Sequence, residues 1–302
     1  MVKNLVLENV SVGFKLPQGV FYAVDDVSLS LPGGNFTAII GESGCGKSVL
    51  GQAILNILPS GVIKKGRVLY NGEQVEKILS AFGIIPQNPS ESLNPVRKIG
   101  KQMQDVLDVH QMADSDNSYK KQCLRLFGLE EAERVLAAYP HELSGGMLQR
   151  VLCAMAVSSK PEWILADEPT KGLDEQVGAV VRKNLLTIKQ DLHLSMLIIT
   201  HDIALAQEVC DDVLVMYAGQ VLEHNMDIWQ KPLHPYTQGF LQALPQNGLQ
   251  VIPGKAPVPG ESFSGCKFAT RCPYCKTRCK EEVPAMQQVG DAEVRCFLYA
   301  EG

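Results

Sequence analysis

The chain has 302 residues, which is enough for one large domain and a smaller one, or for two middling domains. Apolar residues make up 45% and charged residues 20%, as in ordinary soluble globular proteins, and the net charge of −5 argues against a nucleic-acid binder held by a basic surface. No apolar run reaches the ~18 residues of a spanning helix, and the N-terminus lacks the apolar core of a signal peptide. We therefore expect a cytoplasmic protein that contacts membranes only through a partner.

The first third of the chain shows strand patterns. Apolar residues alternate in part over 5–10 and 24–31, and a short apolar strand is expected at 36–40. A glycine-rich turn follows, then a helix over 47–57 and a short strand at 82–85. Residues from about 98 to 158 carry long helical patterns and no strong strand, which predicts a helical subdomain.

Strands and helices then alternate, which predicts a largely parallel sheet covered on both faces. Strands are expected at 163–166, 195–200 and 213–217, and helices at 176–189 and 203–209. Beyond residue 230, prolines punctuate a segment that is too proline-rich to continue the sheet. These prolines are Pro232, Pro235, Pro245, Pro253, Pro257 and Pro259. A domain boundary is expected near 230–260, followed by a cysteine-rich module.

A phosphate-binding loop is predicted at residues 41–48, which fit G-x-x-x-x-G-K-[ST] after a strand and at the start of a helix. Glycines permit the tight loop whose N–H groups face phosphates, and the helix N-terminus favours an anion. Lys47 is placed to reach the β- and γ-phosphates, and the Ser48 hydroxyl is placed to bind Mg²⁺. The loop indicates a nucleotide, but many classes of enzyme share it.

Two further motifs narrow the chemistry. Asp167 and Glu168 end an apolar strand, so Asp167 is expected to hold Mg²⁺ and Glu168 to polarise the attacking water. Ser144, Gly145 and Gly146 open a helix whose N-terminus predicts a second anion site. If the two half-sites of one chain cannot meet, a head-to-tail dimer is needed to close each site.

These motifs resemble those of ATP-binding-cassette (ABC) ATPases over residues 3–230. The resemblance implies a P-loop NTPase fold of α/β class, with a RecA-like core, an antiparallel β subdomain and a helical subdomain at about 88–160. It also implies roles for Gln87 in the Q-loop, Asp174 in the D-loop and His201 in the switch, which contacts the γ-phosphate. Met147 and Gly172 depart from the commoner residues of the signature and D-loop.

The resemblance implies that Mg²⁺ and ATP are bound by residues drawn from all of these motifs. The catalytic residues are expected to be Lys47, Gln87, Glu168 and His201, and the Mg²⁺ ligands Ser48, Gln87 and Asp167. The nucleotide-binding residues are expected to be Phe14, Gly41, Ser43, Gly44, Cys45, Gly46, Lys47, Ser48, Val49, Gln87, Ser144, Gly145, Gly146, Asp167 and Asp174. Phe14 is the expected adenine-stacking aromatic, with Phe21 and Tyr22 as alternatives.

The importer branch is indicated by segments that resemble oligopeptide, dipeptide and nickel importer ATPases. These are residues 87–95, 99–100, 234–245, 252–254 and 265–274. The resemblance implies an ABC domain at 1–232 and a C-terminal extension at 233–302. It also implies a second ATPase subunit, two permeases that dock on residues 88–105, and an external binding protein. The expected location is the cytoplasmic face of a bacterial or archaeal membrane, and the cargo, whether peptide, nickel or a metal chelate, is left open.

Five cysteines crowd the last part of the chain, where little apolar mass is available to stabilise a fold. Four thiolates suit Zn²⁺ or an iron–sulfur cluster. The family pattern implies Cys266, Cys272, Cys279 and Cys296 as ligands of a [4Fe–4S] cluster. The alternatives are Zn²⁺ and cysteines that are metal-free or disulfide-bonded, and Cys275 is an extra thiol that could displace Cys279 or Cys296.

Two other functions compete with that of an importer ATPase. A soluble cassette acting on the ribosome or nucleic acid usually carries two cassettes or a long coiled-coil insertion, and neither pattern is seen here. A regulatory nucleotide-binding protein without turnover is disfavoured by the presence of Glu168.

Overall fold

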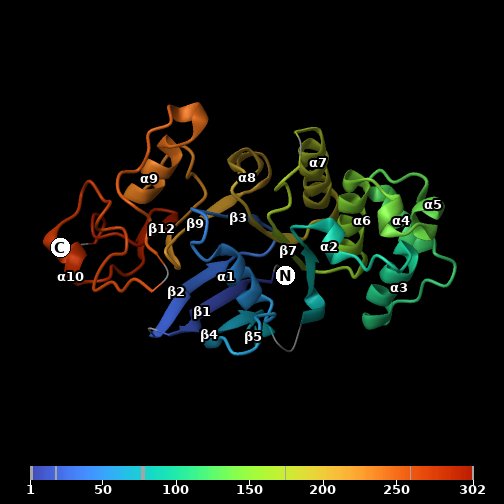
Figure 1. Cartoon of the computed structure of the whole chain (residues 1–302), viewed down its shortest axis with the longest axis horizontal. Helices are drawn as coiled ribbons and strands as arrows, with labels where there is room; N and C mark the ends of the chain where they lie inside the picture. The colour runs from blue at the N-terminus through green and yellow to red at the C-terminus, as the bar shows by residue number, and fades with distance from the viewer. Residues whose placement is uncertain (1–2, 18, 76–78, 174, 259, 301–302) are drawn as a thin grey trace. The chain divides into compact units, whose positions relative to one another are not determined.

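The structure is a computed structural model that describes residues 3–17, 19–75, 79–173, 175–258 and 260–300. The chain forms two compact units (Figure 1). The first unit contains residues 33–36 and 79–209, and the second contains residues 3–32, 37–75 and 210–300. The phosphate loop therefore belongs to the second unit, and the acidic pair belongs to the first. The expected boundary between residues 232 and 233 comes from the resemblance to the family and not from these compact units, so it stays a prediction.

The first unit contains a parallel sheet of strands in the order β8-β7-β6. These strands are β6 (Phe82–Ile85), β7 (Trp163–Asp167) and β8 (Ser195–Ile199). Every residue of β8 is buried, as expected of a parallel strand covered on both faces. The carboxyl ends of β7 and β8 lie at one edge of this sheet, because Asp167 pairs with Ile199.

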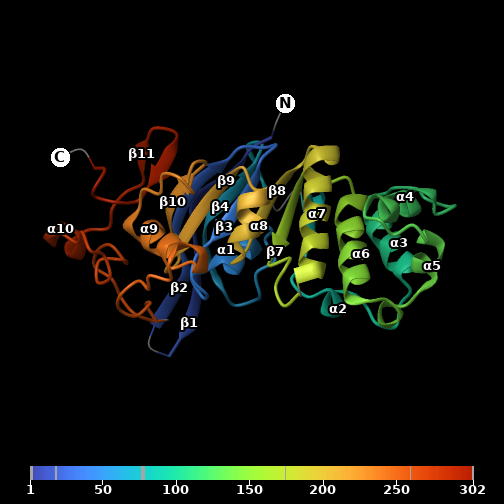
Figure 2. The same cartoon turned by 90° about the horizontal axis from the view of Figure 1, so that it is seen from above.

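Helices make up the rest of the first unit. They are α2 (Pro89–Ser92), α3 (Ile99–Val109), α4 (Ser118–Leu126), α5 (Ala132–Ala137), α6 (Gly145–Ser158), α7 (Glu175–Leu192) and α8 (Ile203–Val209). Helix α6 contacts α3, α4 and α7, and it runs beside α7 in Figure 2. Ile99, Met103 and Leu107 recur every four residues and bury one face of α3.

The second unit contains an antiparallel sheet in the order β2-β1-β4-β5. Its strands are β1 (Leu5–Leu16), β2 (Gly19–Leu31), β4 (Ile63–Tyr70) and β5 (Glu73–Gln74). Leu7 of β1 pairs with Leu29 of β2, and both side chains are buried. This sheet is the antiparallel β part that the sequence resemblance implied.

A second group of strands in this unit runs in the order β11-β12-β10-β9-β3. These are β3 (Phe36–Ile40), β9 (Asp212–Tyr217), β10 (Gln220–Asn225), β11 (Gln287–Val289) and β12 (Ala292–Val294). Strands β3 and β9 pair in parallel, and the other pairs are antiparallel. The sheet thus resumes at 287–294, beyond the proline-rich segment, which the sequence reasoning did not foresee.

The predicted elements match the structure where apolar periodicity is strong. Strands 36–40 and 82–85 and helix 203–209 have the predicted bounds. Helix α1 (Lys47–Ile54) ends before residue 57, because Asn56 takes a left-handed conformation with φ of 54°. Helices α9 (Pro235–Gln242) and α10 (Thr277–Glu281) were not predicted. Across the described ranges, we find no helix with the length and apolar character needed to span a membrane.

Candidate functional site

The phosphate loop joins β3 to α1 and depends on glycines for its shape. Gly41 and Gly46 have φ of 147° and 105°, a region that side chains rarely adopt. A Cβ at Gly41 would lie 2.1 Å from the Met216 carbonyl oxygen, and one at Gly46 would lie 2.0 Å from the Ala23 carbonyl oxygen. Ser43 and Gly44 are exposed on the loop. The close approach of β2 and β9 therefore admits only glycine at these two positions.

Lys47 is the first residue of α1, and its ammonium group lies over the loop. The Nζ atom donates hydrogen bonds to the carbonyl oxygens of Gly41, at 2.9 Å, and Glu42, at 3.1 Å. The Cys45 thiol lies 3.9 Å from Nζ and is buried, and burial raises its pKa. Ser48 and Val49 are half-buried in the first turn of α1. The loop thus keeps a cation at its centre, where the phosphates of a nucleotide would need one.

Glu168 and His201 are brought together in the first unit at the ends of β7 and β8. His201 Nδ1 lies 2.5 Å from Glu168 Oε2, and the His201 backbone N–H approaches the same oxygen at 3.4 Å. The Glu168 side chain is 10% exposed, whereas that of His201 is 59% exposed. The carboxylate is therefore fixed by its neighbour, while the imidazole reaches solvent.

The signature residues form the N-terminus of α6. Ser144 is the N-cap, and its hydroxyl accepts a hydrogen bond from the Met147 N–H at 3.3 Å. Ser144 and Gly145 are exposed, and a Cβ at Gly145 would meet nothing within 4 Å. Gly146 lies near Val177 of α7. The helix start is therefore open to a ligand or to another chain.

The remaining predicted nucleotide residues lie at the ends of strands and in a hairpin. Asp167 is the half-buried last residue of β7, and Gln87 is exposed two residues after β6. Asp174 lies outside the described residues. Phe14 of β1 pairs with Phe21 of β2, and both are half-buried.

A hollow of about 260 Å³ lies beside the phosphate loop within the second unit. Gly44 lines it together with Phe21 and Tyr22, which were the alternatives to Phe14 for contact with adenine. Sequence reasoning missed Tyr236, whose hydroxyl accepts a hydrogen bond from the Glu42 N–H at 3.1 Å. The position of Tyr236 in the 234–245 motif indicated that this residue matters, but the motif did not indicate that it contacts the phosphate loop.

Four of the five C-terminal cysteines line one narrow hollow of about 20 Å³ in the second unit. They are Cys266, Cys272, Cys279 and Cys296, and Cys275 is not among the lining residues. This volume suits about one water-sized occupant. Within the described residues, no three His, Cys, Asp or Glu side chains are already arranged to share a metal ion.

The Lys276 backbone N–H donates to the Cys279 sulfur at 3.5 Å. Burial raises the pKa of Cys266, Cys272 and Cys296, and the backbone N–H groups of Phe268, Tyr274 and Leu298 lower it in part. Such donors favour thiolate, but burial outweighs them and raises the pKa of Cys266 to about 11. The donor set therefore fits a thiolate-bound metal group whose binding would release protons.

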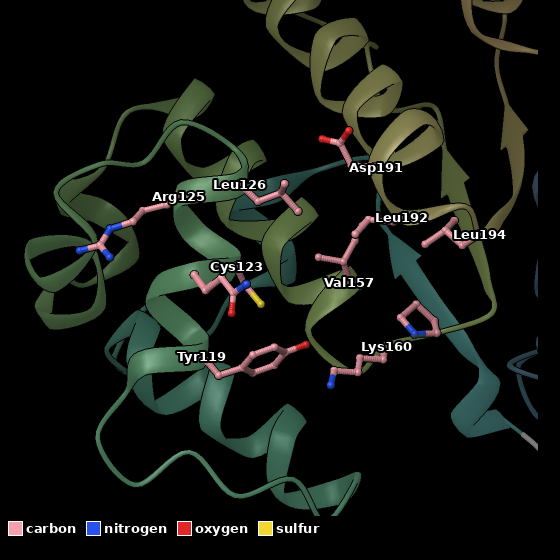
Figure 3. A pocket seen from close by; sticks show the side chains of 11 residues that line it. Tyr119, Cys123, Arg125, Leu126, Val157, Lys160, Asp191, Leu192 and Leu194 are labelled. Atoms are coloured by element: carbon pink, nitrogen blue, oxygen red, sulfur yellow. The ribbon is translucent and has the colours of Figure 1, made fainter.

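A separate hollow of about 870 Å³ lies in the first unit between α4, the end of α6 and residues 191–194 (Figure 3). The Tyr119 hydroxyl donates to the Ser158 carbonyl at 3.0 Å, and the Lys160 ammonium lies 5.3 Å from the Tyr119 ring centre. The residues described as lining it include none of the nucleotide motifs. The hollow is therefore distinct from the candidate nucleotide site.

The α/β units, phosphate loop, signature helix and Glu168–His201 pair define an ABC-type ATPase. Two family descriptions match the chain: "ABC transporter" over residues 24–171, and "Oligopeptide/dipeptide transporter, C-terminal region" over residues 223–279. The chain belongs to the family of ABC transporter ATP-binding proteins that carry this C-terminal region.

Curated relatives match nearly the whole chain. The oligopeptide transport ATP-binding protein OppD of Haemophilus influenzae is 34% identical, with 98% of each chain covered. The dipeptide transport ATP-binding protein DppD of Escherichia coli is 36% identical, with 95% of this chain and 94% of the relative covered. The oligopeptide transport ATP-binding protein AppD of Bacillus subtilis is 35% identical, over 98% of this chain and 97% of the relative.

Solved structures show the same fold over about three quarters of the chain. A dimeric ATP-binding cassette in a post-hydrolysis state with ADP and Pi matches with a TM-score of 0.62 and 26% identity, covering 74% of this chain and 98% of that one. The cbiO1 protein of Clostridium perfringens, part of the transporter complex cbiONQ, also has a TM-score of 0.62 and 26% identity, and covers 76% of this chain and 90% of that one.

Proposed function

We propose that the chain uses ATP hydrolysis to power the import of peptides through membrane subunits that it does not contain. The observation that carries turnover is the 2.5 Å contact between Glu168 and His201, because a carboxylate held beside an exposed imidazole suits activation of water. The peptide cargo is supported by the relatives, which are oligopeptide and dipeptide transport ATP-binding proteins. Nickel or a metal chelate is the alternative cargo.

Each motif is assigned one role in this proposal. Lys47 and the loop N–H groups hold the phosphates, with Phe14, or Phe21 or Tyr22 of the same hairpin, against adenine. Ser48, Gln87 and Asp167 would hold Mg²⁺, which neutralises phosphate charge when bound. Glu168 takes the proton of the attacking water, and His201 orients Glu168 and reaches the γ-phosphate. Asp174 is assigned to the dimer contact.

A second subunit completes the site in this proposal. Ser144, Gly145 and Gly146 cap the nucleotide of a second ATPase subunit, whose own signature caps the nucleotide held by Lys47. The exposed start of α6 supports this arrangement, and one of the solved relatives is a dimer. Closure of the pair of ATPase subunits then drives two permease subunits. An external binding protein delivers the peptide to these permeases.

Residues 88–105 are proposed to receive the permeases at the cytoplasmic face of the membrane. The loop before α3 is held by Gln102, whose amide nitrogen donates to the carbonyl oxygens of Asn94, at 3.1 Å, and Arg97, at 2.9 Å. The Asn94 N–H donates back to the Gln102 side-chain oxygen at 2.8 Å. Val96 is left 79% exposed on this fixed loop. A loop fixed by these hydrogen bonds offers a partner a defined surface.

Residues 233–302 are proposed to form the importer-type extension beyond an ABC domain at 1–232. Within it, Cys266, Cys272, Cys279 and Cys296 would hold a [4Fe–4S] cluster, with Zn²⁺ as the alternative. The hollow that the four thiols share, and the Lys276 N–H that donates to Cys279, support a structural or regulatory metal group. Iron and zinc analysis of anaerobically purified protein tests this assignment, and protein free of both metals would contradict it.

The cargo is tested by uptake in the host organism. Cells in which the chain is replaced by Lys47→Ala should lose uptake of labelled dipeptides and oligopeptides, while uptake of labelled Ni²⁺ stays normal. The matched control is Lys255→Ala, because Lys255 is exposed in the proline-rich segment. Loss of Ni²⁺ uptake with normal peptide uptake would overturn the peptide assignment.

A further inference from the structure

The segment between Cys266 and Cys272 contacts the phosphate loop within the second unit. Arg271 Nη1 donates hydrogen bonds to both carboxylate oxygens of Glu42, at 3.1 and 3.2 Å. Glu42 is the second residue of the phosphate loop. The Arg271 side chain is only 6% exposed, and that of Glu42 is 26% exposed. An ion pair with so little exposure depends on both partners, because either charge alone would be costly to keep out of water.

Arg271 is held in place on several sides. Its Nε donates to the Pro253 carbonyl oxygen at 3.1 Å, and Nη1 also approaches the Tyr217 hydroxyl at 3.3 Å. The guanidinium carbon lies 5.7 Å from the Tyr217 ring centre and 6.0 Å from that of Phe268. The guanidinium is therefore fixed in one orientation toward Glu42 rather than free to sample solvent.

An aromatic group connects the same segment to the loop backbone. The rings of Tyr217 and Tyr236 lie 4.6 Å apart between centres, and Phe268 lies 5.4 Å from Tyr217 and 5.5 Å from Tyr236. Tyr236 accepts the Glu42 N–H, so this group reaches the loop backbone. Phe268 also lines the hollow of the four thiols. The packing is thus continuous from the cysteines to the phosphate loop.

Arg271 balances the negative charge that Glu42 places on the phosphate loop. Glu42 puts a negative charge on the loop that has to hold a negative polyphosphate, and like charges at short range repel. We infer that Arg271 is a positioning residue for nucleotide binding, that it neutralises and fixes Glu42, and that the four-cysteine module holds Arg271 in place. This inference rests on the proposed nucleotide role of the loop. The four-cysteine module would therefore affect nucleotide affinity and not the chemical step.

The first test is ADP affinity of the full-length chain, measured by calorimetry. Arg271→Met should weaken ADP binding about tenfold, because the unpaired Glu42 carboxylate would repel the phosphates at short range. In Glu42→Gln/Arg271→Met the unpaired carboxylate is gone, so most of the affinity should return. Arg67→Met is the matched control, because Arg67 pairs with Glu8 at the surface of the same unit. Unchanged affinity in Arg271→Met, or a double variant as weak as the single one, would overturn the role of Arg271.

The second test addresses the cysteine module. Cys279→Ser should weaken ADP binding to a similar extent in the native chain and add nothing in the Arg271→Met background. Cys275→Ser is the control, since Cys275 does not line the hollow. Circular dichroism of each variant verifies that the rest of the chain is folded. Native ADP affinity in a folded Cys279→Ser protein would overturn the link, whereas absence of iron and zinc from the native protein would refute only the proposed cluster.

Discussion

Glu168 is placed by its backbone as much as by its side chain. Its φ of 49° is unusual for a residue with a Cβ, and such a conformation persists only where neighbours fix it. The Glu168 N–H donates to the Ile199 carbonyl at 2.8 Å, and the carboxylate contacts His201. The structure therefore holds this carboxylate in one position at the end of β7, which is what a general base requires.

Glu168→Gln should bind ATP with native affinity but hydrolyse it at least ~100-fold more slowly, because the amide cannot accept the proton of water. ATP affinity and the rate of phosphate release test the two halves of this prediction. Glu208→Gln is the control, since Glu208 pairs with Arg182 at the surface of the same unit. Phosphate release at the native rate in Glu168→Gln would show that another group is the base.

At the scale of elements, His224 joins the C-terminal hairpin to the rest of the second unit. Its Nε2 lies 3.0 Å from Asp212 of β9, and its Nδ1 lies 3.5 Å from Glu293 of β12. Burial lowers the pKa of His224, but the hydrogen bonds to Asp212 and Glu293 outweigh it and raise the pKa to about 9. Protonated His224 therefore connects three strands across two acidic partners.

This raised pKa predicts how stability depends on pH. The folded pKa lies above the unfolded value of about 6.5, so the stabilisation is fully present below that value and is lost as pH rises through about 9. The unfolding free energy of the native chain relative to His224→Gln should fall by on the order of 3 kcal/mol between pH 6 and pH 10. Urea unfolding at both pH values measures it, with exposed His141→Gln as control. An equal difference at both pH values would contradict the prediction.

Gly83 sets how closely β6 packs on α6. A Cβ there would lie 2.6 Å from the Ala156 carbonyl oxygen and 3.2 Å from Pro161 Cγ. Gly83→Ala should therefore lower the unfolding free energy by about 1–3 kcal/mol, as overpacking does. Gly178→Ala in α7 is the matched control: its Cβ would meet only Arg182 Nη1 at 3.7 Å, and alanine favours a helix by up to about 1 kcal/mol. Thermal unfolding that ranks the two variants in the opposite order would refute this account of the packing.

The elements show which features the sequence could predict. The apolar runs of β3, β6 and β8 and the helical insert were predictable because burial leaves a local pattern. Strand β12 was not, since its three residues carry too little pattern and its pairing with β10 spans a long sequence separation. The contact of Arg271 with Glu42 could not be predicted from the sequence either. The residues next to Arg271 carry no pattern that indicates a partner 229 positions away.

In the whole molecule, the two halves of the proposed nucleotide site come from different parts of one chain. The phosphate loop lies in the second unit, and Ser144, Gly145 and Gly146 begin a helix of the first unit with an open N-terminus. Relatives in the same family match nearly the whole chain. We propose that hydrolysis needs the signature of another subunit to close over the nucleotide held by Lys47.

The need for a second subunit is tested by the rate of ATP hydrolysis per chain, measured over a range of protein concentrations. The molecular mass is determined in the same solutions. We expect no turnover where the chain is a monomer, and turnover that appears with association or on addition of the second ATPase subunit. Ser144→Arg should suppress that gain, because a bulky charge would block the cap. A constant rate per chain that persists in strictly monomeric solution would contradict the account.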